Sequence, residues 1–245
     1  HLHLHSSFGS LQDAVGKPIG YCEKAANIGQ GALGVTEHGS CASHFAFHQA
    51  GEATDTKIIY GNEFYFAADR TLRGLTDEEK NGLTATEVRD ANKARLRKAH
   101  LLLLAETDEG LHNIYRLNYH ANNSGFYGKA TIDLPLLRQY SEGIIATTTC
   151  VISPMARMLQ NKKIDDMSVW FEDMLGIFGK DRFFIELHPH ALDIQREYNQ
   201  VLIEVFRKKY DVKCLVQNDV HYVEQDHHEI HNFLWRLNTD GKFDE

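Results

Sequence analysis

The sequence predicts an α/β fold in which a mainly parallel sheet closes into a barrel. Six apolar stretches have the composition of buried strands, and stretches with helical periodicity separate them. Strands that alternate with helices are typical of parallel sheets. Each stretch also borders a metal-ligand type of residue, and barrels of this kind carry their chemistry at the carboxyl ends of the strands. The six stretches are residues 31–36, 57–61, 100–105, 143–149, 182–187 and 212–217.

The opening segment His1-Leu2-His3-Leu4-His5 alternates imidazole and leucine and forms a seventh expected element. Pro18 suits the first turn of the first helix. Residues 69–98 are highly charged, so we expect a surface excursion that carries a helix near residues 86–98. The expected helical segments are residues 11–29, 41–52, 107–120, 153–178, 191–210 and 224–238.

The bulk properties indicate one globular domain over residues 1–245. Hydrophobic residues make up 42% of the 245 positions, which is enough for a large core, and no Pro/Gly/Ser-rich linker divides the chain. No apolar run approaches the roughly 18 residues that a membrane span needs. The four cysteines lack CxxC spacing and fit a reducing compartment, so we expect a cytoplasmic protein. The chain begins on histidine rather than methionine, which suggests a domain excised from a longer chain.

The formal net charge of −8 argues against a large basic surface for autonomous nucleic-acid binding. It is compatible with a small acidic pocket, because bound cations neutralise a site lined by carboxylates. Phosphate-binding glycine loops of the GxxxxGK[ST] and GxGxxG types are absent, as is the GxSxG nucleophile motif.

Two short motifs at opposite ends of the chain place metal-ligand types on one face of a strand. His3 and His5 are two residues apart, as are Asp219 and His221. Side chains at this spacing share a face, so each pair could chelate one ion. Taken alone, the first motif is weak and the second also suits a cap where a strand meets a loop.

Four further residues stand beside predicted strands. Glu63 follows residues 57–61, and its two oxygens could bridge two cations. His38 follows residues 31–36, His100 opens the third strand, and Cys150 ends the fourth. Simpler interpretations exist, since Glu63 could cap a turn, and His100 and Cys150 could be core residues.

The remaining histidines divide into two groups. His188 and His190 stand at the end of the strand at residues 182–187 and could lie in an outer shell or contact a substrate. Basic contacts to phosphate could come from Lys129 or Arg157. Seven others lie on predicted helices or their flanks, where solvated or capping roles are expected: His44, His48, His112, His120, His227, His228 and His231.

Taken in order, several motifs resemble one known family. They are HLHLHSSFGSLQDA, ALGVTEHGS, IIYGNEFYF, HLLLLAET, GIIATTTC, FFIELHPH and LVQNDVHY. The series resembles the PHP (polymerase and histidinol phosphatase) domain, and most of all the N-terminal domain of bacterial replicative DNA polymerases of the polymerase III alpha (C-family) type. The stretch FYGKATIDLPLLRQYSEGIIATT is also similar to that subgroup. The resemblance covers nearly the whole chain.

The resemblance implies a distorted seven-stranded β/α barrel, a TIM-like fold, with up to three metal ions. It implies one ion on His3, His5, Glu63 and Asp219. Glu63 would bridge to a second ion, held also by His100 and Cys150. The third ion would be held by Asp13, His38 and His221. Two departures from the family pattern are Glu37 in place of aspartate before His38, and one extra residue between His5 and Asp13.

The function implied by the resemblance is metal-assisted phosphoester hydrolysis, most specifically 3′–5′ exonuclease proofreading on a DNA 3′ end presented by a polymerase domain. Glu63, Asp219 and His221 would be catalytic, and His190, Lys129 and Arg157 would contact the substrate. Ligands of this mixture admit two or three ions of zinc, manganese or iron, with magnesium also possible. No polymerase domain follows in these 245 residues.

Two alternatives remain open from the sequence. One is a stand-alone PHP phosphatase acting on a small phosphate monoester. The other is a structural or interaction module of a polymerase without catalysis of its own. Metal analysis separates the structural role from both enzymes, and assays on p-nitrophenyl phosphate and on DNA labelled at the 3′ end separate the two enzymes.

Overall fold

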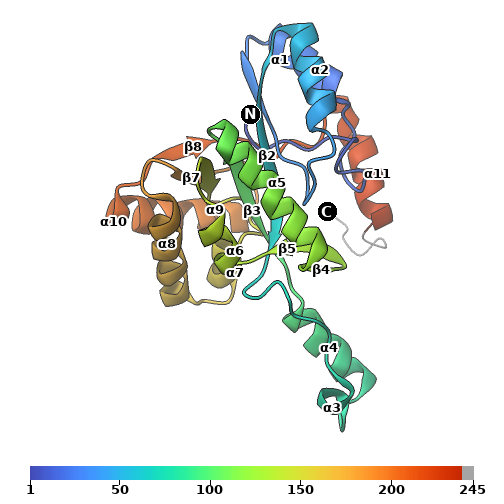
Figure 1. Cartoon of the computed structure of the whole chain (residues 1–245), viewed down its shortest axis with the longest axis vertical. Helices are drawn as coiled ribbons and strands as arrows, with labels where there is room; N and C mark the ends of the chain where they lie inside the picture. Colours follow the sequence, from blue (N-terminus) through green and yellow to red (C-terminus); the bar gives the residue numbers. More distant parts are fainter. Residues whose placement is uncertain (239–245) are drawn as a thin grey trace.

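The computed structural model describes residues 1–238 and shows a curled mixed sheet with helices around it (Figure 1). The strand order is β4-β5-β2-β3-β6-β7-β8, and β1 pairs with β2 outside that path. The strands are β1 (Ala32–Val35), β2 (Lys57–Phe66), β3 (Ala99–Ala105), β4 (Phe126–Tyr127), β5 (Lys129–Ile132), β6 (Ile144–Thr147), β7 (Phe183–Leu187) and β8 (Cys214–Val216).

The opening segment of the chain joins the two ends of this sheet. On one side the Thr36 amide donates to the Leu4 carbonyl at 3.0 Å. On the other side the His5 amide donates to the Val220 carbonyl at 2.8 Å, and the Val220 amide donates to the His3 carbonyl at 3.1 Å. Backbone hydrogen bonds therefore run through the opening segment, β1, β2, β3, β6, β7 and the extension of β8. This ring confirms the expected distorted barrel, with the opening segment as its seventh element.

The sheet is not uniformly parallel, because β3 runs antiparallel to both of its neighbours, β2 and β6. The expectation of parallel strands is wrong at this place. The chain leaves the end of β2 and returns to the same end of the sheet, so β3 must reverse direction. As a result His100, at the start of β3, lies opposite Tyr65 near the end of β2.

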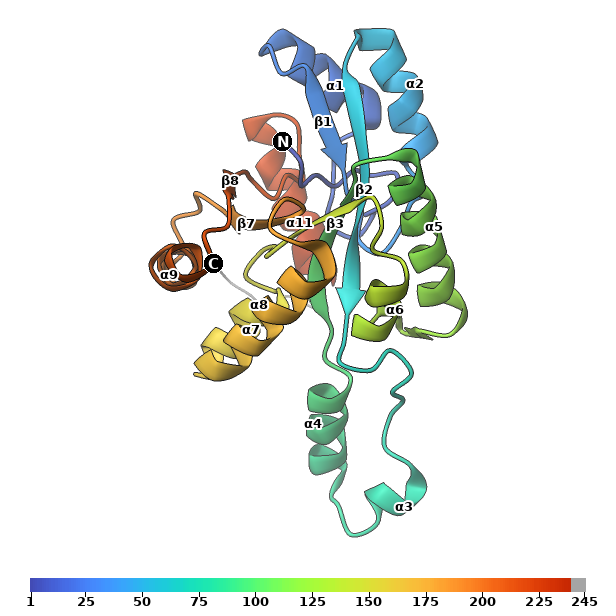
Figure 2. The same ribbon diagram turned by 60° about the vertical axis from the view of Figure 1, so that its left-hand side comes forward.

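The connection between β2 and β3 is the expected surface excursion. It carries α3 (Asp77–Lys80) and α4 (Ala85–Arg95), contains no buried helical residue, and projects away from the barrel (Figures 1 and 2). Each helix begins with a capping box, in which a threonine and a glutamate satisfy each other's backbone amides. Arg70 anchors the root of the excursion through contacts of 3.0 and 2.9 Å with the Asp133 carboxylate.

Strand β2 is longer than expected, and this changes the position of Glu63. The strand continues to Phe66, so Glu63 lies inside it rather than after it. The side chain is fully buried and its residue pairs with Leu102 on β3. A carboxylate held by a central strand has little freedom to move, which suits a group around which other side chains gather.

The helices follow the predicted pattern with four differences. The first helix, expected from residue 11, begins at Pro18, because residues 11–17 form a turn and a loop. Residues 126–139, without a predicted element, form β4, β5 and α6 (Leu134–Gln139). The segment 153–178 divides into α7 (Pro154–Gln160) and α8 (Ile164–Phe178), separated at Lys162, whose φ is 58°. The segment 191–210 contains a π-helical stretch, Leu202–Arg207, between α9 (Asp193–Val201) and α10 (Lys208–Tyr210). The others are α1 (Pro18–Asn27), α2 (His44–Thr54), α5 (Asp108–Asn123), the 3₁₀ turn Gln225–His227 and α11 (His228–Asn238).

The apolar side chains form two clusters that hold the barrel strands in place. The larger one packs α5 and α8 against the sheet, and Leu101 and Leu103 of β3 are fully buried in it. The smaller one packs α1 and α2 against β1 and the opening segment through Leu4 and Phe47. Burial of a leucine or phenylalanine side chain stabilises a fold by about 1.5–3 kcal/mol. Across residues 1–238, no helix combines the length and apolarity required to span a membrane.

Candidate metal centre

The buried Glu63 carboxylate is the centre of a cluster of ligand-type side chains. Its Oε1 lies 3.1 Å from His3 Nε2 and 3.1 Å from His100 Nδ1. Cys150 Sγ lies 3.8 Å from the same oxygen and 3.9 Å from His100 Nδ1. The backbone before this cysteine is sharply turned, because Thr149 has a φ of 59°, a region that β-branched residues rarely adopt.

The second oxygen of Glu63 faces a different set of side chains. Its Oε2 lies 2.6 Å from His38 Nδ1 and 3.7 Å from His5 Nε2. The other nitrogen of His38, Nε2, lies 3.2 Å from Asp13 Oδ2. The two oxygens of one carboxylate therefore face two groups of nitrogen and sulfur ligands.

Asp219 completes the cluster from the opposite side of the barrel. Its Oδ1 lies 3.5 Å from His3 Nε2, 3.2 Å from His5 Nε2 and 3.4 Å from His221 Nδ1. His221 Nε2 lies 4.0 Å from Asp13 Oδ2. The structure thus brings together all nine predicted ligand positions, from the opening segment to the segment after β8.

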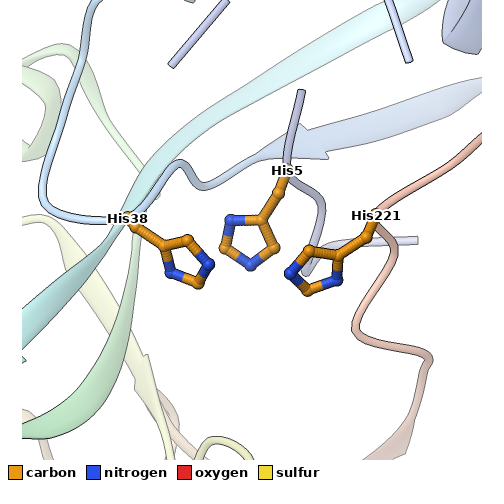
Figure 3. Close-up of side chains that lie close together, drawn as sticks. All are labelled: His5, His38 and His221. Carbon is orange, nitrogen blue, oxygen red and sulfur yellow. The ribbon is translucent and has the colours of Figure 1, made fainter. Parts of the chain in front are cut away.

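Three imidazoles from distant parts of the chain converge in the middle of this cluster (Figure 3). The ring centroids of His5 and His38 are 3.9 Å apart, and those of His5 and His221 are 4.5 Å apart. The three residues come from the opening segment, the loop after β1 and the segment after β8. Such close packing of basic rings requires that most of them be neutral or share a common negative or cationic partner.

The donor atoms of the cluster fit divalent cations. Within residues 1–238, several buried atoms that face one another have no hydrogen bond of acceptable geometry, although buried polar atoms are normally paired. In this described part of the chain, four groups of side chains have donor atoms within 4.8 Å of one another and could each hold an ion. The unpaired atoms are His3 Nε2, His5 Nε2, Asp13 Oδ1, His38 Nδ1, Glu63 Oε2 and Asp219 Oδ1.

The two central carboxylates are held in their ionised form. Burial alone raises the pKa of Glu63, but the positive charges of His100 and His3 bring it well below its usual range. Burial has the same effect on Asp219, and His3 and His221 lower its pKa well below the usual range. Both carboxylates are therefore negative at neutral pH, which gives the cluster an attraction for cations.

Two other members of the cluster are held in their neutral form. Burial, reinforced by the charge of His38, lowers the pKa of His5 to about 3. Burial, reinforced by the negative charge of Glu63, raises the pKa of the Cys150 thiol well above its usual range. His5 is therefore ready to act as a ligand, whereas Cys150 needs a nearby cation to become a thiolate.

Glu186, a residue that the sequence did not single out, fixes the orientation of His3. Its Oε1 accepts hydrogen bonds from His3 Nδ1 at 2.8 Å and from His188 Nε2 at 2.6 Å. Its Oε2 accepts from the Thr147 hydroxyl. All four side chains are buried. Burial lowers the pKa of His3, but the surrounding carboxylates raise it well above its usual range. In the neutral form that binds a metal, the contact with Glu186 would hold the proton on Nδ1 and leave the lone pair of Nε2 facing the cluster, as in metal-bound histidines generally. His188 hydrogen-bonds to Glu186, and its outer-shell role stays a prediction.

Glu37 supports His5 in a similar way through a serine. The Ser10 hydroxyl donates to Glu37 Oε2 at 2.7 Å and accepts a longer contact of 3.4 Å from His5 Nδ1. The amide of His38 also donates to the Ser10 hydroxyl, at 3.1 Å. The glutamate before His38 thus lies outside the cluster and acts on it through Ser10. A buried acidic residue in an otherwise apolar strand, such as Glu186 in FFIEL, is the sequence signal that could have identified such partners.

A cleft of about 1040 Å³ opens onto the cluster. His38, His100, Asp219 and His221 lie along it, with the side chains of Asp219 and His221 18% and 16% exposed. Of the three expected substrate contacts, His190 and Lys129 line the cleft. Arg157 lies on α7, half-buried and outside the cleft lining, and its contact with substrate stays a prediction.

Three histidines expected to be solvated or capping lie in other surroundings. His44 is buried, and its Nε2 donates to the Gly61 carbonyl at 2.9 Å, so it stabilises the join between α2 and β2. His228 and His231 of α11 line the cleft, and the His231 ring lies 5.3 Å from that of His221. Their roles could not be read from the sequence because the position of α11 depends on tertiary packing.

Comparison with known proteins places these residues in context. The profile of the PHP domain matches residues 1–190. The DNA polymerase III subunit alpha of Aquifex aeolicus strain VF5 is 32% identical over 237 residues, which cover 97% of this chain and 19% of that protein. The same subunit of Thermus aquaticus is 31% identical over 247 residues, which cover 100% of this chain and 19% of that protein. The chain thus spans about a fifth of the length of these relatives.

One solved structure shows the same fold at low sequence identity. It is an amidohydrolase from Chromobacterium violaceum with bound sulfate and no metal. The two chains superpose with a TM-score of 0.50 and 12% identity, covering 92% of this chain and 88% of the other. This likeness concerns the fold of the barrel.

Proposed function

Because the chain belongs to the PHP domain family, we propose that it is a metal-dependent phosphoesterase that shortens DNA from its 3′ end. The observation that carries the proposal is the set of unpaired donor atoms gathered around Glu63 at the floor of an open cleft. A cluster that served only to stabilise the fold would pair these atoms with one another. Here the atoms lie as close as 2.6 Å to one another without hydrogen bonds of acceptable geometry, and Asp13, His38 and Asp219 of the set line the cleft.

Three groups of side chains would hold the ions. The group His3, His5, Glu63 and Asp219 has its donor atoms within 4.8 Å of one another, in agreement with the first implied site. His38 joins Glu63 and His100 in a second group, beside Cys150, which lies 3.8 Å from Glu63. Asp13 lies between His38 and His221, at 3.2 and 4.0 Å. Zinc, manganese or iron suit this mixture of nitrogen, oxygen and sulfur, and magnesium is possible.

Divalent ions in such a site supply activation of a water nucleophile and neutralisation of charge on a phosphate. The chain's own residues provide the geometry for this chemistry. Glu63 is fully buried and holds the two sides of the cluster at a fixed separation. Asp219 and His221 are partly exposed at the cleft, and in this proposal their carboxylate and imidazole groups would orient a water molecule and accept its proton.

DNA is the favoured substrate because the relatives that align over the whole chain are DNA polymerase subunits. In this proposal residues 1–245 form one domain of a longer polymerase chain. Because the net charge of this domain is −8, most of the affinity for DNA would come from the rest of that polymerase chain. Lys129 and His190 in the cleft would contact the phosphate near the cluster.

The experiment that tests the proposal compares two substrates after metal restoration. The chain is treated with a chelator, and zinc or manganese is added back in the presence of a 3′-labelled oligonucleotide or of p-nitrophenyl phosphate. We expect stepwise shortening of single-stranded DNA with weak apparent affinity. Turnover of the monoester without shortening would establish the phosphatase instead. A metal-loaded protein inactive on both substrates would establish the structural role.

We expect two or three divalent ions per chain, about 3–5 Å apart by analogy with two-metal hydrolytic sites. Elemental analysis of protein purified without chelator gives the number, and anomalous scattering gives the positions. Cys150→Ser should lower the content of the ion near His100, because a serine hydroxyl is a poor substitute for thiolate. A crystal structure of the metal-loaded protein in which no ion lies near Glu63 would contradict the assignment.

Glu186→Gln keeps the size of the side chain but removes the negative charge that orients His3 and accepts from His188. Loss of such a partner typically lowers metal affinity about 10–100-fold. Competition with a metallochromic chelator measures the change. Glu197→Gln, on α9 away from the cluster, is the matched control and should bind metal like the wild type.

A further inference from the structure

Helix α11 presents its polar and aromatic side chains inward and its apolar side chains outward. An ordinary surface helix buries its apolar face. In α11, Ile230, Phe233 and Leu237 are instead 52%, 61% and 61% exposed. The residues on the opposite face of the helix form a stripe at helical spacing. This stripe lines the cleft that opens onto the cluster. This stripe is His228, His231, Asn232, Trp235 and Asn238.

The helix is held across the cleft by specific contacts. The Asn238 side-chain amide donates to the backbone carbonyl of Gln12, next to Asp13. At the other end the His231 ring lies 5.3 Å from His221 and 5.5 Å from Tyr222. Both ends of the inner stripe are therefore tied to segments that also carry members of the cluster. In Figure 1, α11 stands at the right of the barrel, beside the dark-blue loop that follows the opening segment.

The composition of this stripe is suited to a ligand with a flat aromatic face and polar edges. Trp235 is 37% exposed, which leaves part of its ring accessible to the cleft. Aromatic rings stack on nucleobases regardless of their identity, and asparagine and glutamine amides pair with base edges. Gln12 and Gln225 supply such amides along the same cleft.

The wall across the cleft has the complementary chemistry. Lys129 Nζ lies 4.8 Å above the Tyr65 ring, and both residues line the cleft together with His100. A cation held over an aromatic ring beside the cluster suits a phosphate group. The cleft thus has a cationic side for phosphate and an aromatic side for a base, with the cluster between them.

We propose that the inner face of α11 is a nucleobase-binding wall, in which Trp235 stacks on a base at the end of a single strand. This inference rests on the proposed phosphoesterase function and specifies its substrate class as a nucleic acid strand rather than a small phosphate ester. A small phosphate ester without a base needs only the cluster and Lys129. The cleft, by contrast, has a volume of about 1040 Å³ and an aromatic wall. These features suit a ligand that carries a nucleotide-sized group beside the scissile phosphate.

Tryptophan fluorescence gives a direct readout that needs no catalysis. The chain has two tryptophans, and Trp170 is 5% exposed in the core. In W170F, Trp235 is the only tryptophan, and the wild type serves as the reference should W170F fold poorly. The probe is oligothymidylate, titrated in chelator so that no cleavage occurs. An oligonucleotide of equal length with abasic sugars at its 3′ end keeps the phosphates and lacks the base faces.

We expect saturable quenching by oligothymidylate and little by the abasic probe. W235A should weaken binding, followed by anisotropy of a 5′-labelled probe, by about 5- to 150-fold, the range that base–aromatic stacking covers. W235F should restore most of the affinity because it keeps a ring. F233A, which removes an exposed ring from the outer face of the same helix, should bind like the wild type.

Equal quenching by both probes, or unchanged binding by W235A, overturns the inference. The metal-restored cleavage assay separates this result from failure of the proposed function. Shortening of the oligonucleotide at the same KM by wild type and W235A would leave the phosphoesterase in place and remove the base wall. Base-dependent quenching without any cleavage would leave the base wall in place and remove the phosphoesterase.

Discussion

Glu63→Gln should lower metal-dependent hydrolysis by at least about 100-fold, the effect of losing one preorganised electrostatic group at a reaction centre. Glu63 is the carboxylate whose two oxygens face both sides of the cluster, at 3.1 Å from His3 and 2.6 Å from His38. An amide of the same shape offers one weak oxygen ligand and one NH₂ group, which cannot coordinate a cation. Elemental analysis should show the loss of at least one ion together with the loss of turnover.

The control for this variant removes an exposed glutamate just beyond the neighbouring strand. Glu106 follows β3 at the end opposite to His100 and is exposed, so Glu106→Gln should leave activity and metal content unchanged. Circular dichroism shows whether Glu63→Gln retains the fold, since removal of one partner from a buried ionic cluster costs about 3–5 kcal/mol. Full activity in a folded Glu63→Gln protein would contradict the central role of this carboxylate.

Most residues of the cluster could be found from the sequence because strand ends are readable locally, whereas Asp13, which lies in a turn, came only from the family resemblance. His3 and His5, like Asp219 and His221, are related by the two-residue period of a strand. Apolar runs mark where each strand lies, and a polar residue beside such a run points to the rim. The groupings around each ion came from the family resemblance, and the first of them coincides with a group of donor atoms in the structure.

The direction of β3 could not be read in the same way. A parallel and an antiparallel strand have similar composition when both faces are buried, as in HLLLLA. The deciding feature is the excursion at residues 69–98, which returns to the end of the sheet that it left. The end of β2 was also misplaced, because glycine and asparagine at positions 61 and 62 suggest a break, whereas the pairing with β3 continues to Phe66.

Residues that support the cluster were missed because they depend on contacts between distant segments. Glu186 meets His3 across 183 positions in the sequence. His231 was expected on a solvated face, since helical position alone does not reveal what lies opposite. The amphipathic pattern of α11 even points the wrong way, because its apolar face is the exposed one. This exposure of the apolar face points to a role for the polar face only once the position of the cleft is known.

Asp219→Ala should abolish hydrolysis and remove most of the stabilisation that metal gives to the fold. Ligands that bind only the folded state stabilise it by about 2.7 kcal/mol at 100 times their dissociation constant. For a chain of this size that corresponds to a rise in Tm of roughly 5–11 °C between chelator and saturating metal. Asp219 lies 3.2 Å from His5 and 3.4 Å from His221, so its loss leaves the first group with three donors.

The decisive quantity is the difference between the Tm in saturating metal and the Tm in chelator. In chelator, Asp219→Ala removes a carboxylate that contacts His3 and His5, but it also removes the repulsion between this carboxylate and Glu63. The Tm difference between the variant and the wild type should therefore be smaller in chelator than in saturating metal. His221→Ala should behave in the same manner. Asp226→Ala is the matched control, because its side chain is 89% exposed on the neighbouring 3₁₀ turn. Retention by Asp219→Ala of both the metal-dependent rise in Tm and the hydrolysis would show that the ions, if bound, lie elsewhere in the chain.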